Sequence, residues 1–100
     1  MARIVIKESD MHHHLLARMQ QRGITKEEIE RTLNEGWKAD DAKEGTAGKV
    51  LFFPFASFWE GVYFEEKEVT VYYKYKGERL IVLTAKARYG KDFARGGKEQ

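Results

Sequence analysis

The sequence predicts one α+β domain, in which an N-terminal αα-hairpin packs on a curved antiparallel β-sheet of about four strands. Three observations predict this class. Apolar residues recur at helical spacing in the first third of the chain, two alternating strand patterns joined by a tight turn lie in the last third, and glycines separate the elements. With 100 residues, 42% of them hydrophobic, the chain is long and apolar enough for one core.

The domain is expected to span residues 1–95, with residues 96–100 as a frayed tail. Cysteine is absent, which excludes disulfides and thiolate metal sites. No apolar stretch approaches the ~20 residues that a membrane span needs, and the start MARIVIKESD lacks the apolar length of a signal peptide. We therefore expect a cytoplasmic protein without a membrane partner.

The first third is predicted to be a short strand followed by a helix. Arg3–Lys7 has three β-favouring apolar residues between charges, which is typical of a strand. Ser9 or Asp10 is expected to cap a helix over Met11–Arg22, because a side-chain oxygen can accept bonds from the amides of the first turn. Gly23 should end this helix with a positive φ.

The second helix has the clearest start signal. Thr25 and Glu28 have the spacing of a capping box, and Ile24 and Ile29 can form the flanking hydrophobic staple. Gly36 is expected to end this helix. An αα-hairpin is therefore the firmest local prediction.

The remaining chain is predicted to form strands. Trp37–Ala42 and Lys49–Phe53 are short strand candidates, and Pro54 either ends the second or places it at a sheet edge. Glu68–Tyr75 and Arg79–Tyr89 alternate most clearly, and the three residues between them predict a hairpin.

An aromatic segment lies before this hairpin. Seven aromatic residues in thirteen positions exceed what one strand needs, and the irregular pattern of residues 55–64 predicts no definite structure. Some are expected to complete the core, and others to line a groove or a dimer contact. The seven are Phe52, Phe53, Phe55, Phe58, Trp59, Tyr63 and Phe64.

One row of side chains has the chemistry for phosphate binding and proton transfer. His14, Arg18 and Arg22 are four residues apart, so they lie on one helix face. Arginine can bind phosphate oxygens, and histidine can carry a proton near neutral pH. A solvated helix face explains the same spacing, and spacing alone favours that explanation.

Three adjacent histidines, His12, His13 and His14, raise the question of a metal site. Adjacent residues of a helix point about 100° apart, so these side chains are not expected to converge on one ion. We therefore predict no metal site and no cofactor.

Strand alternation predicts a basic surface on the terminal hairpin. One face should pack on the helices through Val69, Val71, Tyr73, Tyr75, Ile81, Leu83, Ala85 and Ala87. The opposite face collects Tyr72, Lys74, Thr84, Lys86 and Arg88, and six basic residues stand against one acidic residue between positions 79 and 98. Such a surface can bind nucleic acid by phosphate contacts and stacking. An ordinary polar solvent face explains the pattern equally well.

Two segments resemble a known family. HLLARMQQRGITKEEI, at residues 14–29, resembles the opening of the small bacterial family called domain of unknown function 4258, whose pattern is roughly H-A-x-x-R-M-x-x-R-G-I-S-x-x-x-V. Leu15 replaces a small residue and Thr25 a serine. LIVLT at 80–84 is similar to the closing strand of the family, while ARYG at 87–90 departs from it.

The resemblance implies a fold related to RelE-like and colicin-like metal-independent ribonuclease toxins, and it matches His14, Arg18 and Arg22. The leading hypothesis is therefore a small RNA-directed toxin-like protein with possible activity as a metal-independent endoribonuclease. His14 would act as base or acid. Arg18, Arg22 and Arg88 would stabilise charge, and Tyr89 or Lys86 would donate a proton or position phosphate. The expected RNA-binding residues are Tyr72, Lys74, Lys86 and Lys91.

The expected partners are RNA and either a cognate antitoxin or a second copy of the chain. The alternative hypothesis is a non-catalytic protein- or nucleic-acid-binding domain that uses the aromatic segment as its interface. Geometry distinguishes the two. A cleft containing His14, Arg18 and Arg88 would favour the enzyme, whereas their separation on opposite faces would favour the binding domain.

Overall fold

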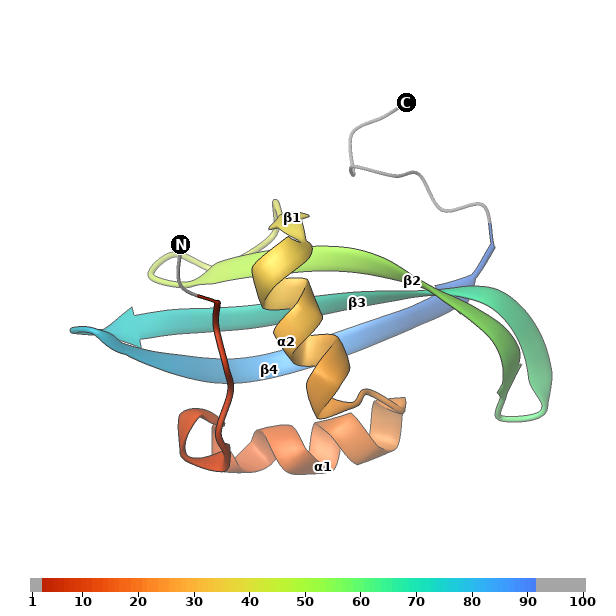
Figure 1. The fold of residues 1–100 in the computed structure, drawn as a ribbon, viewed down its shortest axis with the longest axis horizontal. Helices are drawn as coiled ribbons and strands as arrows, with labels where there is room; N and C mark the ends of the chain where they lie inside the picture. The colour runs from red at the N-terminus through yellow and green to blue at the C-terminus, as the bar shows by residue number, and fades with distance from the viewer. Residues whose placement is uncertain (1–2, 92–100) are drawn as a thin grey trace.

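The computed structural model describes residues 3–91 and confirms the predicted fold class. Two helices precede four antiparallel strands in the order β1-β2-β3-β4 (Figure 1). Helix α1 lies along β4, and α2 contacts β2 and β3. The elements are η1 (Glu8–Asp10), α1 (His13–Arg22), α2 (Lys26–Glu35), β1 (Trp37–Lys38), β2 (Ala47–Trp59), β3 (Val62–Lys76) and β4 (Arg79–Gly90). The predicted tail at 96–100 lies outside the described residues.

The predicted strand at Arg3–Lys7 is wrong. This segment is extended but joins no strand of the described sheet, and it runs beside α2 (Figure 1). The N–H of Ile4 donates to Asn34 Oδ1 at 2.8 Å, and the N–H of Ile6 donates to Glu30 Oε2 at 2.8 Å. Side chains of α2 therefore satisfy the amides that a neighbouring strand would otherwise bind.

The predicted cap of the first helix is also wrong, because α1 begins two residues later than expected. Asp10 accepts a bond from the N–H of Lys7 at 2.9 Å and so closes the preceding turn. The N–H of His12 donates to the carbonyl of Val82 at 2.9 Å, which keeps the chain extended beside β4. His12 is the N-cap of α1.

The connection between the helices is as predicted. Gly23 ends α1 with φ 70°, and Thr25 and Glu28 form a complete capping box. A side chain at Gly23 would meet the ring of Trp59, with a Cβ only 2.6 Å from Cζ3. Both the backbone conformation and the close contact therefore require glycine here.

Strand β2 is much longer than predicted and β1 is shorter. Within the described residues, β2 pairs with β1 only at Val50 and Lys49, so Pro54 lies on the outer edge of the sheet. Its missing N–H breaks no ladder bond there, which confirms the edge-strand alternative. A register shift between Pro54 and Ser57, with Ala56 at φ 42°, then bends β2.

The segment 55–64, whose structure the sequence did not predict, forms the far end of the β2–β3 hairpin. We call residues 55–64 the arm. Its turn is Glu60-Gly61, with φ of 52° and 84°, the combination that a tight hairpin turn requires. Figure 1 shows the arm curling away from the sheet, which is the curvature that the fold class predicts.

The terminal hairpin forms as predicted, but part of its face assignment is wrong. A register shift pairs Tyr72 with Thr84 and Tyr73 with Val82, so that Leu83 is an extra residue in β4. Val82 is therefore fully buried against the helices, in place of the expected Ile81 and Leu83. Beyond the shift, Ala85 and Ala87 face the helices as expected.

Candidate binding surface on the helix-free face

The predicted site residues lie in three separate places. We define the helix-free face as the side of the sheet opposite the two helices. Tyr72, Lys86 and Arg88 line one hollow on that face, with a volume of about 280 Å³. His14 and Arg18 are exposed on α1, while Arg22 and Tyr89 connect α1 to β4 on the helix side. The structure therefore does not bring His14, Arg18 and Arg88 into one cleft.

Arg22 and Tyr89 make structural contacts. Arg22 Nη1 donates to the carbonyl of Ala85 at 2.7 Å, and the Tyr89 hydroxyl donates to the carbonyl of Arg22 at 2.7 Å. Burial, with smaller contributions from Glu28 and Glu60, raises the pKa of Tyr89 to about 12. The phenol therefore keeps its proton and uses it to hold α1 in place.

His14 and Arg18 lie on the outer surface of α1. The neighbouring His13 is the largest cause that lowers the pKa of His14, followed by desolvation, His12 and Arg18. His14 is therefore mainly neutral near pH 7. The expectation that the three histidines cannot converge was wrong in its geometry, because His12 is extended instead of helical and its ring stacks on those of His13 and His14.

One carboxylate organises the hollow on the helix-free face. The Tyr72 hydroxyl donates to Asp41 Oδ1 at 2.8 Å, and Lys86 Nζ donates to Asp41 Oδ2 at 3.3 Å. Lys86 Nζ also lies 5.5 Å from the centre of the Tyr72 ring. Asp41 comes from the loop between β1 and β2, so it links three separate parts of the chain.

A second ion pair lies beside the first. Arg88 Nε donates to Glu68 Oε1 at 3.0 Å, and its Nη2 donates to Glu68 Oε2 at 3.1 Å. The two residues are directly opposite each other on β4 and β3. This two-point geometry holds the guanidinium in a fixed plane at the surface.

The pKa shifts on this face all strengthen the existing charge states. The hydrogen bond from Tyr72 is the main cause that lowers the pKa of Asp41, and Tyr72 and Asp41 together raise the pKa of Lys86. Glu68 raises the pKa of Arg88, and burial is the main cause that raises the pKa of Tyr72. These groups therefore hold fixed charges and protons near pH 7 and are poorly suited to proton transfer.

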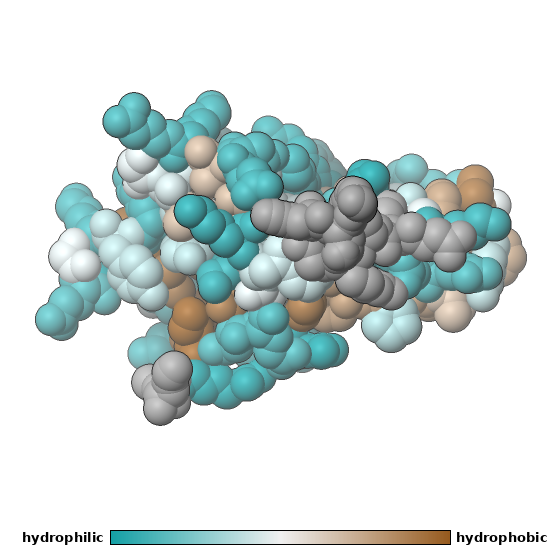
Figure 2. Space-filling view, turned by 90° about the horizontal axis from the view of Figure 1, so that it is seen from above, coloured by the Kyte–Doolittle hydropathy of each residue, from teal (hydrophilic) through white to brown (hydrophobic). Residues whose placement is uncertain are grey.

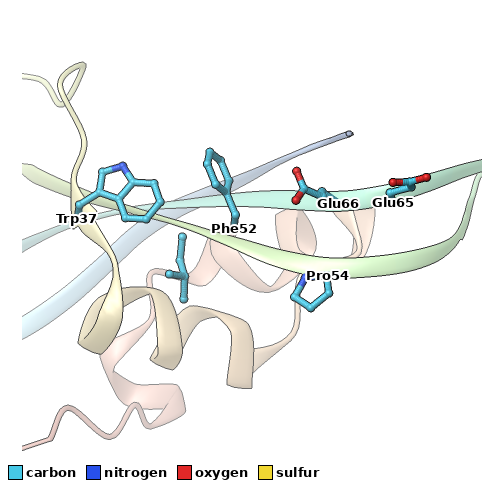
Figure 3. A pocket seen from close by; sticks show the side chains of 6 residues that line it. Trp37, Phe52, Pro54, Glu65 and Glu66 are labelled. Carbon is cyan, nitrogen blue, oxygen red and sulfur yellow. The ribbon is translucent and has the colours of Figure 1, made fainter. Parts of the chain in front are cut away.

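Aromatic residues adjoin the hollow. Trp37 and Phe52 pack edge to face, with ring centres 5.3 Å apart. Both also line a second hollow of about 440 Å³, which continues toward the arm past Pro54, Glu65 and Glu66 (Figure 3). The first hollow therefore combines paired cations with aromatic rings on the helix-free face. Lys74 is exposed further along β3, and Lys91 is exposed just beyond the end of β4.

The sequence analysis did not predict that Lys67 is buried. Its side chain is 3% exposed, and Nζ donates to the carbonyl of Gly23 and to both oxygens of Glu28, at 2.8 and 3.0 Å. The rings of Phe55 and Tyr89 lie 5.7 and 5.6 Å from Nζ. The EEKE pattern around Lys67 indicates a solvated strand, so no local signal predicts this burial.

The arm presents two different faces. Trp59 stacks on Tyr89, with ring centres 5.1 Å apart, and this inner face covers Gly23. The outer face exposes Phe58, Val62 and Tyr63 by 66%, 54% and 50%. Figure 2 shows apolar atoms at this end of the molecule. The aromatic segment therefore completes the core on one side and leaves an apolar surface on the other.

The fold and this surface define a small α+β domain with an open sheet face that carries paired charges and aromatic rings. The chain belongs to the family described as domain of unknown function (DUF4258), which it matches over residues 11–86. No curated protein and no solved structure matches the chain. Within residues 3–91, no helix has the length and apolar character to cross a membrane. Relatedness to ribonuclease toxins stays a prediction.

Proposed function

We propose that this protein is an RNA-directed domain that binds single-stranded RNA on the helix-free face and does not cleave it. The observation that carries the proposal is the gathering of Tyr72, Lys86 and Arg88 around one hollow, while His14 and Arg18 lie on α1. This separation is the geometry expected of a binding domain. The predicted relatedness of the family to RelE-like and colicin-like toxins is the reason for choosing RNA as the ligand.

The cations of the helix-free face can reach a phosphate. The side chains of Lys86 and Arg88 are 52% and 63% exposed, although both are paired with carboxylates. Lys86 and Asp41 form an exposed ion pair, which contributes only about 0–1 kcal/mol, so a phosphate oxygen can replace the Asp41 oxygen at small cost. Glu68 is only 16% exposed, so it keeps Arg88 in position while the exposed part of the guanidinium contacts a phosphate.

Aromatic rings on the same face can supply the second half of single-strand recognition. Trp37 and Phe52 lie beside the hollow, and base stacking on such rings contributes about 1–3 kcal/mol per base. Stacking tolerates any base, whereas hydrogen bonds to base edges would be needed for sequence preference. We therefore expect affinity for single strands with little dependence on sequence.

Cleavage is disfavoured by the protonation chemistry of this face. Metal-free cleavage needs a base for the 2′-hydroxyl and an acid for the leaving oxygen, both with pKa values near the working pH. The only imidazoles of the chain are on the opposite side, and the pKa shifts of Asp41, Lys86 and Tyr72 move away from neutrality. The residues of the hollow are better suited to holding phosphate than to moving protons.

The direct test compares how tightly two matched double variants of the protein bind a fluorescent single-stranded RNA. We expect Lys86→Ala with Arg88→Ala to weaken binding by about tenfold or more, because a hydrogen bond to a charged group contributes ~1.5–3 kcal/mol. Arg18→Ala with Lys26→Ala removes the same charge from the helices and should have little effect. Equal losses in the two double variants would contradict the proposal, as would RNA cleavage that survives a chelator.

The outer face of the arm supports a second candidate function, which is protein binding. Phe58 and Tyr63 are exposed, yet they pack edge to face with ring centres 5.5 Å apart, so they form a rigid apolar pair. Rigid aromatic side chains are common anchors of protein interfaces. Sedimentation analysis tests whether the partner is a second copy, because Phe58→Ser with Tyr63→Ser would then convert dimers to monomers. A wild-type protein that stays monomeric at high concentration would exclude that partner.

A further inference from the structure

We propose that His12, His13 and His14 form a surface site for a divalent first-row transition metal ion, with Cu²⁺ bound most tightly. One ligand nitrogen from each imidazole lies within 4.8 Å of the others. The ring centres are 4.5, 5.1 and 4.1 Å apart for the three pairs. The site is independent of the RNA proposal, because it lies at the start of α1 and not on the helix-free face.

The backbone explains why three consecutive residues can converge. His13 and His14 occupy the first turn of α1, whereas His12 precedes the helix with φ −63° and ψ 144°. Its N–H donates to the carbonyl of Val82, and Met11 bridges to Val82 as well. Strand β4 therefore fixes His12 in the extended conformation that places its ring over the first turn of the helix.

The ligand atoms have suitable chemistry for this class of metal. Neutral imidazole binds copper, nickel and zinc, and the general order of affinity for divalent ions places Cu²⁺ first. Magnesium and calcium prefer oxygen ligands and should not compete. Three protein ligands leave at least one coordination position for water.

Binding requires a small rearrangement at His12. Its Nδ1 accepts the N–H of His14 at 3.3 Å, which is longer than an ordinary hydrogen bond. Coordination through Nε2 of His12 moves the ring proton to Nδ1 and releases this weak bond. Metal–nitrogen bonds of about 2.0–2.1 Å also require the three rings to close together slightly, which exposed side chains can do.

Two features oppose the bound charge. The amino end of α1 carries a partial positive charge, and Arg18 lies one turn further along the helix. We therefore expect weaker binding than at a buried site of three histidines. Replacing Arg18 should tighten binding, because it removes one cation from the neighbourhood of His14.

The test is a titration of the full chain with CuCl₂ by calorimetry, with electron paramagnetic resonance to identify the coordinated nitrogens. We expect one Cu²⁺ per chain and imidazole nitrogen ligands. His12→Asn, His13→Ala and His14→Ala should each lower the affinity by at least about tenfold, because losing even a residue that only supports a metal ligand commonly costs about 10–100-fold. Asparagine at position 12 keeps a capping oxygen, so α1 should still begin normally.

The variant that lacks all three histidines is a complete control. The chain contains no other histidine and no cysteine, so any binding that survives comes from carboxylates or the amino terminus. Equal affinity in this variant and the wild type would overturn the proposal. Full affinity in any one of the three single variants would also overturn it, because two histidines would then be sufficient.

Discussion

Among residues 3–91, two lysine–carboxylate pairs have a tyrosine beside them, and the surroundings of the two pairs differ completely. The side chains of Lys67 and Glu28 are 3% and 20% exposed, whereas those of Lys86 and Asp41 are 52% and 62% exposed. The buried pair holds the turn between the helices against β3. The exposed pair connects a loop to the helix-free face and remains accessible to solvent.

The same residue types therefore stabilise the fold in one place, while in the other they remain accessible to solvent. Removing one partner of a buried pair leaves an uncompensated charge, which a low-dielectric interior penalises strongly. Removing one partner of an exposed pair leaves a charge that water solvates.

Lys67→Met should lower the free energy of unfolding by about 3–5 kcal/mol, because it leaves the Glu28 carboxylate and the carbonyl of Gly23 without their hydrogen-bond donor. Lys86→Met, the same substitution in the exposed pair, should change it by less than about 1 kcal/mol. Denaturant unfolding followed by circular dichroism measures both values. Similar losses in the two variants would show that the two pairs do not differ as the structure indicates.

Gly23→Ala should cost about 2–4 kcal/mol, because it adds a clash with Trp59 to the strain of a left-handed alanine. Gly77 is the matched control. It has φ 63° but no atom within 4 Å of a built Cβ, so Gly77→Ala should cost only about 1–2 kcal/mol of backbone strain. The difference between the two melting curves isolates the contact of the arm with the helices. Equal losses would mean that Trp59 moves aside freely.

Asp41→Asn should have a small effect that depends on pH. The pKa of Asp41 is lowered in the folded protein, so its carboxylate stabilises the fold above its ordinary pKa, and this contribution is lost as the pH falls through the lower folded value. We expect the variant to be less stable than the wild type by under 1 kcal/mol at pH 7. Unfolding curves at pH 7 and at about pH 2 should show the difference disappearing in acid. A difference that grows in acid would contradict the assigned pKa direction.

The sequence predicts local structure best where one side chain or one glycine decides it. The capping box at Thr25 and Glu28 and the positive φ of Gly23 depend on neighbouring residues, and both predictions are confirmed. The helix start at His13 depends on a hydrogen bond to Val82, about seventy residues away, and was therefore missed. The same holds for Arg3–Lys7, whose amides bond to side chains of α2.

For the candidate site too, the sequence predicts the features that depend on a local pattern and misses those that depend on distant contacts. Alternation correctly places Tyr72, Lys86 and Arg88 on one face, because each strand keeps its period in that region. The period changes at Leu83, where a bulge that no residue type announces exchanges the faces of Ile81 and Val82. Asp41 and Lys67 take their roles from contacts with distant strands and helices, which local patterns do not encode.

The central claim is that RNA binds on the helix-free face and not on the row of His14, Arg18 and Arg22 along α1. Mapping amide chemical shifts by NMR during a titration with a short unstructured RNA tests this claim most directly. The account predicts that the largest shifts lie at Tyr72, Lys86 and Arg88 and their neighbours on β3 and β4, with residues 14–22 almost unchanged. Shifts centred on His14 and Arg18, with the sheet unchanged, would contradict it.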